Sequence, residues 1–402
     1  MINAIGQLQG TSGYASHFRG VVNELNKLTD CKIVTNLQQG FEREVNDQEL
    51  EMLKREQDYD INLIITHPLH WRANLSAKRN WVYLVWEGDK VPKWILEECL
   101  NPKIEKIICP SEHTKQALLN TRQEVFKSIT GLSAEFKDIN LEEKLVVIPH
   151  GYNKEDFYSQ RKKDKDDGSN DTLSGDTNQL QGQTKKEEQM PASVDNHADT
   201  FKFLANKGLR NLEDRGGIPY LIKAYLEEFT ELNNVELILK INSAYGVPNL
   251  LKMFPNIKQN GIPKITFIHE NYTTEQMNEL YNSCDVFVSP TRSEAFNLPV
   301  LESAACKKTS ITTDFGGQTD FINNDNGYLI DYKLAPVTHE IEYEETMWAT
   351  PNIKHLRRLL RYTFEHPEEV KQKGEKAYED CKHLTWANTA KQIYELTEVK
   401  NG

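Results

Sequence analysis

Short apolar stretches alternate with longer helical stretches along this 402-residue chain, and this alternation constrains its fold most. The stretches run for only a few residues and are rich in Val, Ile and Leu, as is typical of strands buried on both faces. Apolar helical segments such as residues 219–232 and 275–284 lie between them. The expected strands are residues 32–35, 61–66, 81–86, 106–109 and 145–148 in the first half, and 201–205, 236–241, 265–268, 286–288 and 309–312 in the second. The pattern predicts an α/β fold of parallel, doubly wound sheets with helices on both faces.

A polar segment divides the chain into two halves. Residues 161–200 are rich in charged residues, Gly, Ser and Asn, and contain almost no bulky apolar side chains. Such a segment cannot bury enough surface to offset the entropy of ordering it. We therefore expect a disordered linker or insertion over residues 159–200, between domains at 1–158 and 201–383, with a regulatory or docking tail as the alternative. Each half carries its own strands, so ligands should bind beyond the carboxyl ends of those strands.

Composition excludes several classes of protein. The formal net charge of −12 argues against a broad nucleic-acid-binding face. No apolar run approaches the roughly 18 residues of a membrane span, and the first residues lack the basic and apolar regions of a signal peptide. The six cysteines are scattered without a C-x-x-C pair, as is typical of reduced thiols. We expect a cytoplasmic protein with at most peripheral membrane contact and without nucleic acid as a partner.

Two glutamates flank a predicted helix start just after residues 286–288. Asn297 is typical of an N-cap, and a proline follows two residues later, so a helix should begin here. Glu294 then lies in the preceding loop, and Glu302 lies about one turn inside the helix and leans back toward the same ligand. Backbone amides around Phe296, Asn297 and Leu298 favour an anion. Carboxylates that bind hydroxyl groups, next to amides that bind phosphate, suit a sugar nucleotide. The alternative is an ordinary turn with two surface acids.

The spacing of these glutamates resembles the E-x7-E signature of retaining glycosyltransferases of the GT-B fold, family 4 in particular. The flanking segments S-P-T-R-S and G-G-Q-T-D at 316–320 support the resemblance, as do C-P-S-E-H at 109–113 and I-P-H-G-Y-N at 148–153. The resemblance implies that Glu294 contacts the donor hexose and that Glu302 contacts the nucleotide ribose. It also implies two Rossmann-like domains facing across a cleft, with a C-terminal helix at about 384–402 crossing back onto the first domain.

Cations that suit a diphosphate follow the stretch 201–205. Arg210 and Arg215 flank a helix start opened by glycines, and guanidinium groups beside helix amides favour phosphate. The resemblance implies that both cations contact the donor pyrophosphate, with Arg215 standing where the family usually has Lys. Lys240, at the end of its strand, is a further candidate for this cleft. Two solvated arginines on a loop are the alternative.

Three residues of the first half are further candidates. Gly13, in G-T-S-G-Y-A, precedes an expected helix at about 16–27, and glycine lets backbone approach a ligand closely. This segment resembles the family's glycine loop, which borders the donor phosphate and the acceptor. His67 and His70 follow residues 61–66, where an imidazole can orient or deprotonate an acceptor hydroxyl. A plain turn and a packed loop histidine are the alternatives, and neither histidine is preferred as a base.

Carboxylates at another strand end complete the candidate residues. Glu87 lies in W-E-G-D, which is similar to a W-E-T-D segment found in a branch of the family. In that branch the segment faces the acceptor. It is either an acceptor-side carboxylate or a structural acid at a turn. Asp58 and Asp60 match the D-x-D pattern that holds a metal in other glycosyltransferases. They precede a strand here, and the resemblance implies a metal-independent enzyme, so we expect no metal site and no cofactor.

Together with these observations, the resemblance implies a retaining GT-B glycosyltransferase that moves a hexose from a nucleotide-diphosphate sugar. UDP-glucose is slightly favoured over GDP-mannose as the donor, and the acceptor can be a glycan, a lipid, a protein or a small molecule. Electrostatic stabilisation of the leaving diphosphate should supply most of the rate. One alternative is an inactive sugar-nucleotide-binding partner of an active homologue. The other is a nicotinamide-dependent enzyme, against which the absence of G-x-G-x-x-G after the first strand argues.

Overall fold

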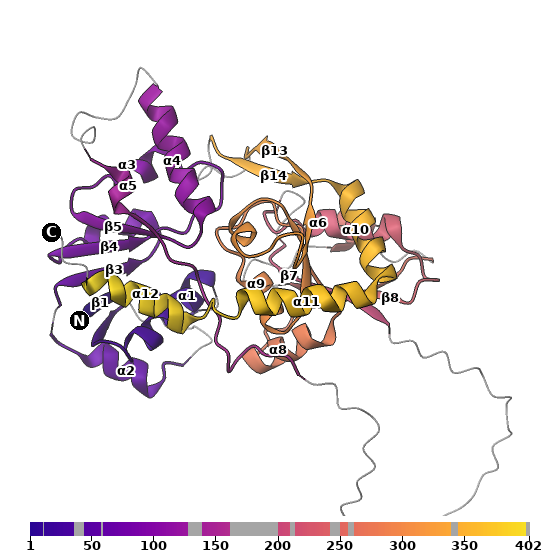
Figure 1. Cartoon of the computed structure of the whole chain (residues 1–402), viewed down its shortest axis with the longest axis horizontal. Coiled ribbons are helices and arrows are strands. Elements are labelled where there is room, and N and C mark those ends of the chain that lie inside the picture. The colour runs from indigo at the N-terminus through magenta and orange to yellow at the C-terminus, as the bar shows by residue number, and fades with distance from the viewer. Residues whose placement is uncertain are drawn as a thin grey trace, which may run out of the picture.

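The computed structural model describes residues 1–10, 12–35, 44–57, 59–127, 139–160, 200–209, 214–241, 250–255, 261–338 and 345–398. Over these residues the chain forms an N-terminal and a C-terminal α/β domain that lie side by side (Figure 1). Residues 161–199 of the expected linker at 159–200, together with Asp58 and Arg210, lie outside the described residues.

The first domain is built on a parallel sheet with strand order β2-β1-β3-β4-β5-β6 among the described residues. Its strands are β1 (Ile2–Gly6), β2 (Cys31–Val34), β3 (Ile61–Ile65), β4 (Arg79–Tyr83), β5 (Ile104–Cys109) and β6 (Leu145–Val147). Its helices are α1 (Gly13–Leu25), α2 (Asp47–Lys54), α3 (Lys93–Cys99), α4 (Glu112–Lys127) and α5 (Leu141–Lys144). Strand β1 was not among the expected strands, although it is buried and pairs with both β2 and β3.

The second domain repeats this architecture, with strand order β12-β11-β10-β7-β8-β9 in the described part of the chain. Its strands are β7 (Phe201–Lys207), β8 (Val235–Ile241), β9 (Lys264–Ile268), β10 (Val286–Ser289), β11 (Thr309–Thr313) and β12 (Tyr328–Ile330). Its helices are α6 (Ile218–Glu228), α7 (Leu250–Met253), α8 (Thr274–Ser283), α9 (Leu298–Ala305), α10 (Ile353–Glu365) and α11 (Pro367–Cys381). The predicted fold class, two doubly wound parallel sheets, is confirmed.

The chain crosses between the domains twice. Tyr152 and Phe157, which the sequence places in the first half, pack instead in the core of the second domain. At the other end, α12 (Trp386–Glu398) leaves α11 and returns to the first domain, where it lies beside α1 (Figure 1). Its Ala390 and Ile393 are fully buried in the core of that domain. Because apolar surface from both crossings is buried, these segments bind the two domains together.

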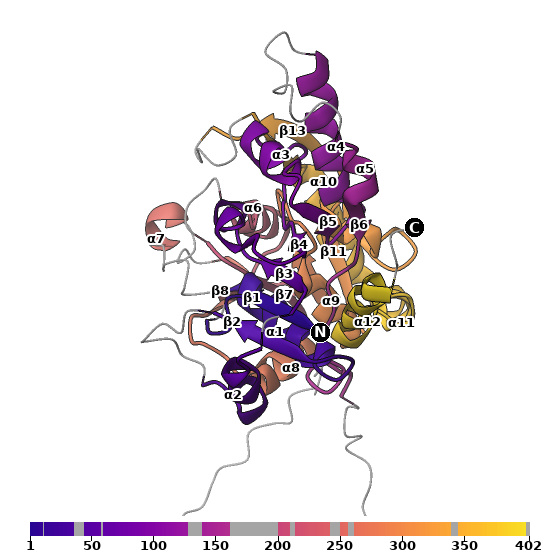
Figure 2. The ribbon, with the colours of Figure 1, turned by 90° about the vertical axis from the view of Figure 1, so that its left-hand side faces the viewer.

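A β-hairpin provides another link between the domains. Strands β13 (Tyr332–Pro336) and β14 (Met347–Pro351) pair antiparallel, and β13 is seen behind α3 in the view of Figure 2. Trp348 is fully buried in a core cluster of the first domain. The hairpin also packs on Gly88, where a Cβ atom would lie only 1.9 Å from Thr346 Cγ2. A glycine at this position therefore lets the hairpin approach the first domain closely, because a larger side chain would collide with it.

Candidate functional site

Glu294 lies at the centre of the proposed site and pairs with a lysine that was not among the sequence candidates. Lys207, the last residue of β7, donates through Nζ to Glu294 Oε1 at 2.8 Å and to Asn297 Oδ1 at 2.7 Å. The side chains of Lys207 and Glu294 are 7% and 18% exposed. Burial raises the pKa of Glu294, but Lys207 and Arg215 outweigh it and the net shift is downward. Glu294 is therefore ionised and held in a fixed orientation.

Glycines hold the loop that carries Glu294. The amide of Gly317 donates to the carbonyl oxygen of Glu294 at 2.8 Å. A Cβ atom on Gly317 would lie 1.9 Å from the carbonyl oxygen of Ala295, and Gly316 has a φ of 111°. This close approach requires glycine. The G-G-Q-T-D turn, for which the sequence predicted no role, thus supports the backbone of Glu294.

Asn297 begins helix α9 but does not cap it through its side chain. The helix starts at Leu298 as predicted, and Asn297 has a φ of 76°, in the left-handed region that Asn tolerates better than most residues. Its side chain instead accepts from Lys207 and donates to Ser289 Oγ at 3.0 Å. Phe296 turns away from this network and packs with Phe321. Asn297 therefore occupies the N-cap position as predicted, but its side chain makes no capping bond because contacts with β7 and β10 engage it.

Glu302 is oriented by a buried tyrosine. Tyr281, on α8, is fully buried and donates to Glu302 Oε2 at 2.7 Å, and it accepts from Asn206 Nδ2 at 3.3 Å. Burial raises the pKa of Glu302 to about 7, while the bond from Tyr281 and the charge of Lys207 lower it. Asp156 raises it further. Glu302 therefore changes its ionisation near neutral pH and has one oxygen fixed by Tyr281.

Lys240 lies beside these residues at the end of β8. It is paired in the sheet register with Asn206 of β7, and it is 6% exposed. Its ammonium group lies 5.5 Å from the ring centroid of Tyr272. Burial lowers the pKa of Lys240, and Glu270 opposes this shift. Lys240 thus lies near the carboxyl end of β8, at the end of the sheet where Lys207 ends the neighbouring strand β7.

Arg215 contacts a carboxylate of the other domain. Its guanidinium forms an ion pair with Glu87, which follows β4 in the first domain. The carbonyl oxygen of Arg215 accepts from the amide of Arg292 at 2.8 Å, which ties its loop to the loop of Glu294. Glu87, predicted to be either an acceptor-side carboxylate or a structural acid at a turn, thus binds a cation of the second domain. The structure thus brings Glu87, Arg215, Lys207 and Glu294 into one charged cluster.

Other contacts bring the two domains together at this cluster. Ser293 donates to the carbonyl oxygen of Glu87, and Ser111 Oγ donates to the carbonyl oxygen of Ala295 at 2.7 Å. The amide of Glu112, at the start of α4, donates to Asp320 at 2.7 Å. The loop of Glu294 is therefore bonded to the first domain on both sides of the carboxylate. The carboxyl ends of strands from both sheets meet here, as expected for ligand binding in this fold.

Two of the remaining first-domain candidates, His67 and His70, lie at a separate pocket. A cavity of about 640 Å³ opens at the carboxyl ends of β1, β2 and β3, and both His67 and His70 line it. His67 precedes a 3-10 turn and accepts from the amide of Leu69, while His70 is exposed. Gly13 begins α1, and a Cβ atom there would meet no other atom within 4 Å. Gly13 is therefore not required by packing among the described residues.

A pair of histidines is buried where the domains meet. His17 of α1 and His150 have ring centroids 4.1 Å apart, and His150 also lies 5.2 Å from the ring of Phe296. Burial lowers the pKa of both, that of His150 to about 3. Both rings are therefore neutral at pH 7 and act as packing groups.

No group of metal ligands and no membrane span occurs in the described part of the chain. It holds no cluster of three or more His, Cys, Asp or Glu side chains that could bind a metal ion. Asp60 pairs with Lys78 at 2.8 Å. None of the described helices combines the length and the apolar composition that crossing a bilayer requires.

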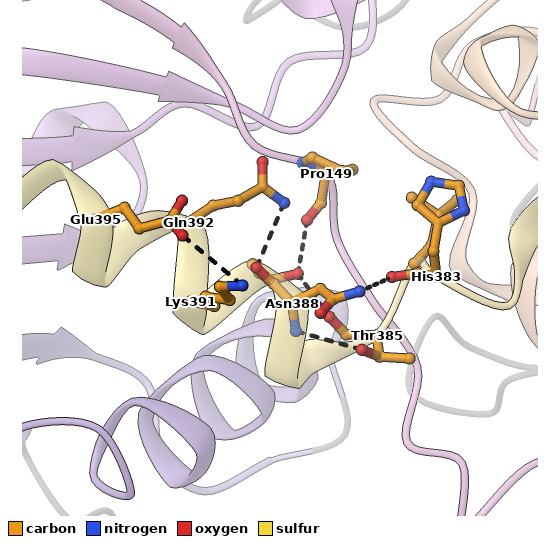
Figure 3. A pocket seen from close by; sticks show the side chains of 9 residues that line it. Pro149, His383, Thr385, Asn388, Lys391, Gln392 and Glu395 are labelled. Carbon is orange, nitrogen blue, oxygen red and sulfur yellow. Dashed lines mark hydrogen bonds and ion pairs between the residues drawn. The ribbon is translucent and has the colours of Figure 1, made fainter.

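A smaller cavity of about 220 Å³ lies beside α12, and Pro149 and Asn388 are among its lining residues (Figure 3). Its polar side chains bond mainly to their own helix. Thr389 donates to the carbonyl oxygen of Pro149 at 2.8 Å and so joins α12 to the end of the first domain. This cavity lies at the crossing between the domains and away from the charged cluster, so we assign it no ligand.

Residues 209–338 match the family model described as glycosyl transferases group 1. This segment contains Arg215, Glu294 and Glu302, the residues that surround the start of α9. No curated protein matches the sequence.

Several solved structures with a similar fold align over almost the whole length of this chain. A glycosyltransferase from Rickettsia africae aligns with a TM-score of 0.64 and 16% identity, over 100% of this chain and 99% of its own. Sucrose-phosphate synthase from Thermosynechococcus elongatus aligns with a TM-score of 0.61 and 14% identity, over 99% of this chain and 98% of its own. Anabaena HepE in complex with UDP-glucose aligns with a TM-score of 0.59 and 13% identity, over 99% of both chains. The chain therefore has the GT-B fold.

Proposed function

We propose that this protein is a glycosyltransferase that moves a hexose from a nucleotide-diphosphate sugar to an acceptor hydroxyl. One observation carries the proposal. Glu294 and Glu302 lie on either side of the start of α9, each held by its own buried partner, Lys207 or Tyr281. Both glutamates fall inside the segment that matches glycosyl transferases group 1. In this assignment Glu294 binds the hexose hydroxyls and Glu302 binds the ribose hydroxyls.

The leaving diphosphate is stabilised by charge that the protein supplies. Lys207 and Arg215 lie next to Glu294, and the backbone amides at Leu298 begin α9. Positive charge fixed where negative charge develops lowers the barrier without reorganisation. Arg210 joins them in the proposal on the strength of the sequence alone. We propose that the reaction needs no metal ion and retains the anomeric configuration, as the family resemblance implies.

UDP-glucose is the donor that we propose to test first, because the similar fold of Anabaena HepE was solved with this sugar nucleotide. The six cysteines are free and buried, which suits a reducing compartment, so we propose a cytoplasmic location.

A donor panel tests the proposed activity. Purified protein is incubated with UDP-glucose, UDP-N-acetylglucosamine and GDP-mannose, and release of the nucleotide diphosphate is measured with and without EDTA. We expect release from one donor, unchanged by the chelator, and no release from that donor by Glu294→Ala. NMR of the product then shows whether the anomeric configuration is retained. If every donor stays intact and none binds in calorimetry, the proposed function is wrong.

One observation favours an alternative, a sugar-nucleotide-binding protein without transfer activity. Arg215 is engaged by Glu87, so one proposed phosphate ligand is already neutralised by a carboxylate of the other domain. Such a protein would bind the donor but would not cleave it under any acceptor condition. Calorimetry and nucleotide release on the same preparation therefore separate the two functions.

A further inference from the structure

The pocket of the first domain lies on the same side of its sheet as the charged cluster. It opens beyond the carboxyl ends of β1, β2 and β3, and Glu87 and Ser111 follow the carboxyl ends of β4 and β5. In a parallel sheet these ends share one edge. Tyr14 lines the pocket, and its hydroxyl lies 3.5 Å from the carbonyl oxygen of Val85, two residues before Glu87. The pocket and the charged cluster are therefore neighbours.

The chemistry of the pocket differs from that of the charged cluster. Among the described residues, no Lys, Arg, Asp or Glu lines it. Its polar groups are the carboxamides, hydroxyls and imidazoles of Gln7, Gln9, Tyr14, Thr35, Thr66, His67, His70 and Asn74. Its apolar wall comes from Ile5, Val34, Ile65 and Ala73. The cavity of about 640 Å³ falls within the usual range for sites that bind small molecules.

The wall formed by residues 66–74 is held in place by its own hydrogen bonds. Trp71 is fully buried and donates through Nε1 to the carbonyl oxygen of Thr66 at 3.0 Å. Asn74 Nδ2 donates to the carbonyl oxygen of His70 at 2.7 Å, and Asn62 Nδ2 donates to that of Asn74 at 2.7 Å. The polar groups of this wall are therefore fixed before a ligand arrives, which lowers the entropy lost on binding.

His67 is arranged as a hydrogen-bond donor. The amide of Leu69 points to Nδ1 of His67 at 3.4 Å, so Nδ1 is the accepting nitrogen. A neutral imidazole that accepts through one nitrogen carries its proton on the other. In this form Nε2 of His67 carries the donor hydrogen, so this nitrogen cannot accept a proton as a base would.

We propose that this pocket binds an uncharged sugar and that a hydroxyl group of this sugar is the glycosyl acceptor. A phosphate or carboxylate placed here would lose hydration without meeting a cation from the described lining residues, which is costly. Hydroxyl groups both donate and accept, so they match carboxamides, hydroxyls and imidazoles, while the apolar wall suits the C–H face of a sugar ring. The inference rests on the proposed function and narrows its acceptor.

The transfer is balanced without a further reactant. The acceptor oxygen forms a bond to the anomeric carbon of the hexose, and the bond from that carbon to the diphosphate oxygen breaks. The proton of the acceptor hydroxyl leaves with the nucleotide diphosphate, so the products are a glycoside and the free nucleotide.

Matched pairs of acceptors test the proposal. The full-length protein is given the donor found in the panel above, with glucose or glucose 6-phosphate, fructose or fructose 6-phosphate, and maltose or maltose 1-phosphate. Mass spectrometry measures the transfer product. We expect product from at least one neutral sugar, and at least tenfold less from its phosphorylated partner. Product from the phosphorylated members alone overturns the inference, as does the absence of any product while donor hydrolysis continues. If the protein neither binds nor hydrolyses the donor, the proposed function itself is wrong, and not only the inference about the acceptor.

A charge placed in the pocket provides an independent test. Thr35, partly buried in the pocket lining, is replaced by lysine, with Thr35→Met as the uncharged control of similar length. If the pocket holds the acceptor, Thr35→Lys should raise kcat/KM for the phosphorylated sugar relative to the neutral one by about tenfold, as expected for a new charge-assisted bond. Thr35→Met should leave this ratio unchanged. Equal ratios in the two variants would overturn the inference, and unchanged UDP binding in both shows that the donor site is intact.

Discussion

The charged cluster and the pocket of the first domain differ most in the charge of their side chains. On the second domain, Lys207, Glu294 and Arg215 form a connected set of ion pairs, together with Glu87 from the first domain. The first-domain pocket has no charged side chain among the described residues that line it. The difference suits a division of tasks, since a diphosphate that gains charge needs fixed cations, whereas a neutral hydroxyl needs only hydrogen-bonding groups.

This difference should determine how each region responds to mutation. Removing one partner of a buried ion pair leaves an uncompensated charge and costs about 3–5 kcal/mol. Removing a neutral hydrogen bond costs about 0.5–1.5 kcal/mol. Substitutions in the charged cluster should therefore impair the protein far more than substitutions in the pocket. The predictions below test this contrast, starting with the largest expected effect.

Lys207→Ala should have the largest effect on transfer. The substitution leaves Glu294 and Asn297 without their shared partner and removes a cation from the proposed diphosphate site. We expect kcat/KM for the donor to fall about a thousandfold, as for the loss of a group that stabilises the developing charge. Steady-state nucleotide release measures the rate, and circular dichroism checks that the protein is folded.

Lys202→Ala is the matched control, because Lys202 lies on the same strand, β7, near its opposite end. Its rate should stay close to that of the wild type. A folded Lys207→Ala protein that keeps a tenth or more of the wild-type rate would remove Lys207 from the proposed mechanism and weaken the contrast between the two regions.

Arg215→Ala should lower kcat about a hundredfold and raise the donor KM by less, because the diphosphate gains charge in the transition state. Arg215→Lys should keep most of the activity, since an ammonium group can still serve one phosphate oxygen.

Glu87→Gln removes the carboxylate that competes with the diphosphate for Arg215. We expect this variant to bind UDP about fivefold more tightly, since one charge-assisted contact no longer has to be broken.

Calorimetry with UDP compares Arg215→Ala, Arg215→Lys and Glu87→Gln, and initial rates separate kcat from KM. Weaker UDP binding by Glu87→Gln would mean that Glu87 organises Arg215 for the donor and does not compete with it.

Glu302→Ala should weaken nucleotide binding by about 1.5–3 kcal/mol, or roughly 10- to 150-fold, because the ribose hydroxyls lose an ionised partner. The pKa of Glu302, raised to about 7 by burial, adds a pH dependence. The carboxylate ionises as pH rises from 6 to 8, and the ionised form accepts hydrogen bonds more strongly. UDP binding should therefore strengthen over this interval.

Tyr281→Phe sharpens this test. The bond from Tyr281 lowers the pKa of Glu302, so its loss should move the binding transition to higher pH. Calorimetry from pH 6 to 8 measures the profile. Glu302→Gln is the control, since its remaining pH dependence belongs to the nucleotide. If Glu302→Gln and the wild type show the same profile, Glu302 does not bind the nucleotide through its carboxylate.

The sequence predicted the features that depend on local pattern. The short apolar stretches located most of the strands, and the spacing of Glu294 and Glu302 placed them correctly around the start of α9. Strand β1 was not predicted, because Asn3 interrupts its short apolar run and its burial depends on pairing with β2 and β3. The predicted features follow from periodicity and capping, which act over a few residues.

The sequence did not predict the partners of these residues. Lys207 and Glu294 are 87 residues apart, and Arg215 and Glu87 are 128 apart. Such pairs depend on how β7, the loop before α9 and the first domain pack together. One signal was present for Lys207, a lysine that ends a strongly apolar strand and so must lie at the edge where ligands bind. The burial of Trp348 in the other domain had no local signal at all.

His67→Ala should have the smallest effect of these substitutions, because it changes the uncharged pocket and leaves the charged cluster intact. The substitution removes one polar side chain of the pocket proposed for the acceptor sugar, while UDP binding should remain as in the wild type. We expect the KM for the neutral acceptor to rise by about five- to tenfold with little change in kcat, as for the loss of one neutral hydrogen bond. His67→Gln keeps an N–H donor and should recover most of the lost affinity. Initial rates against acceptor concentration, at saturating donor, measure both constants. A roughly hundredfold or larger fall in kcat, without recovery by His67→Gln, would show that His67 acts as a base and that the pocket takes part in the chemistry as well as in binding.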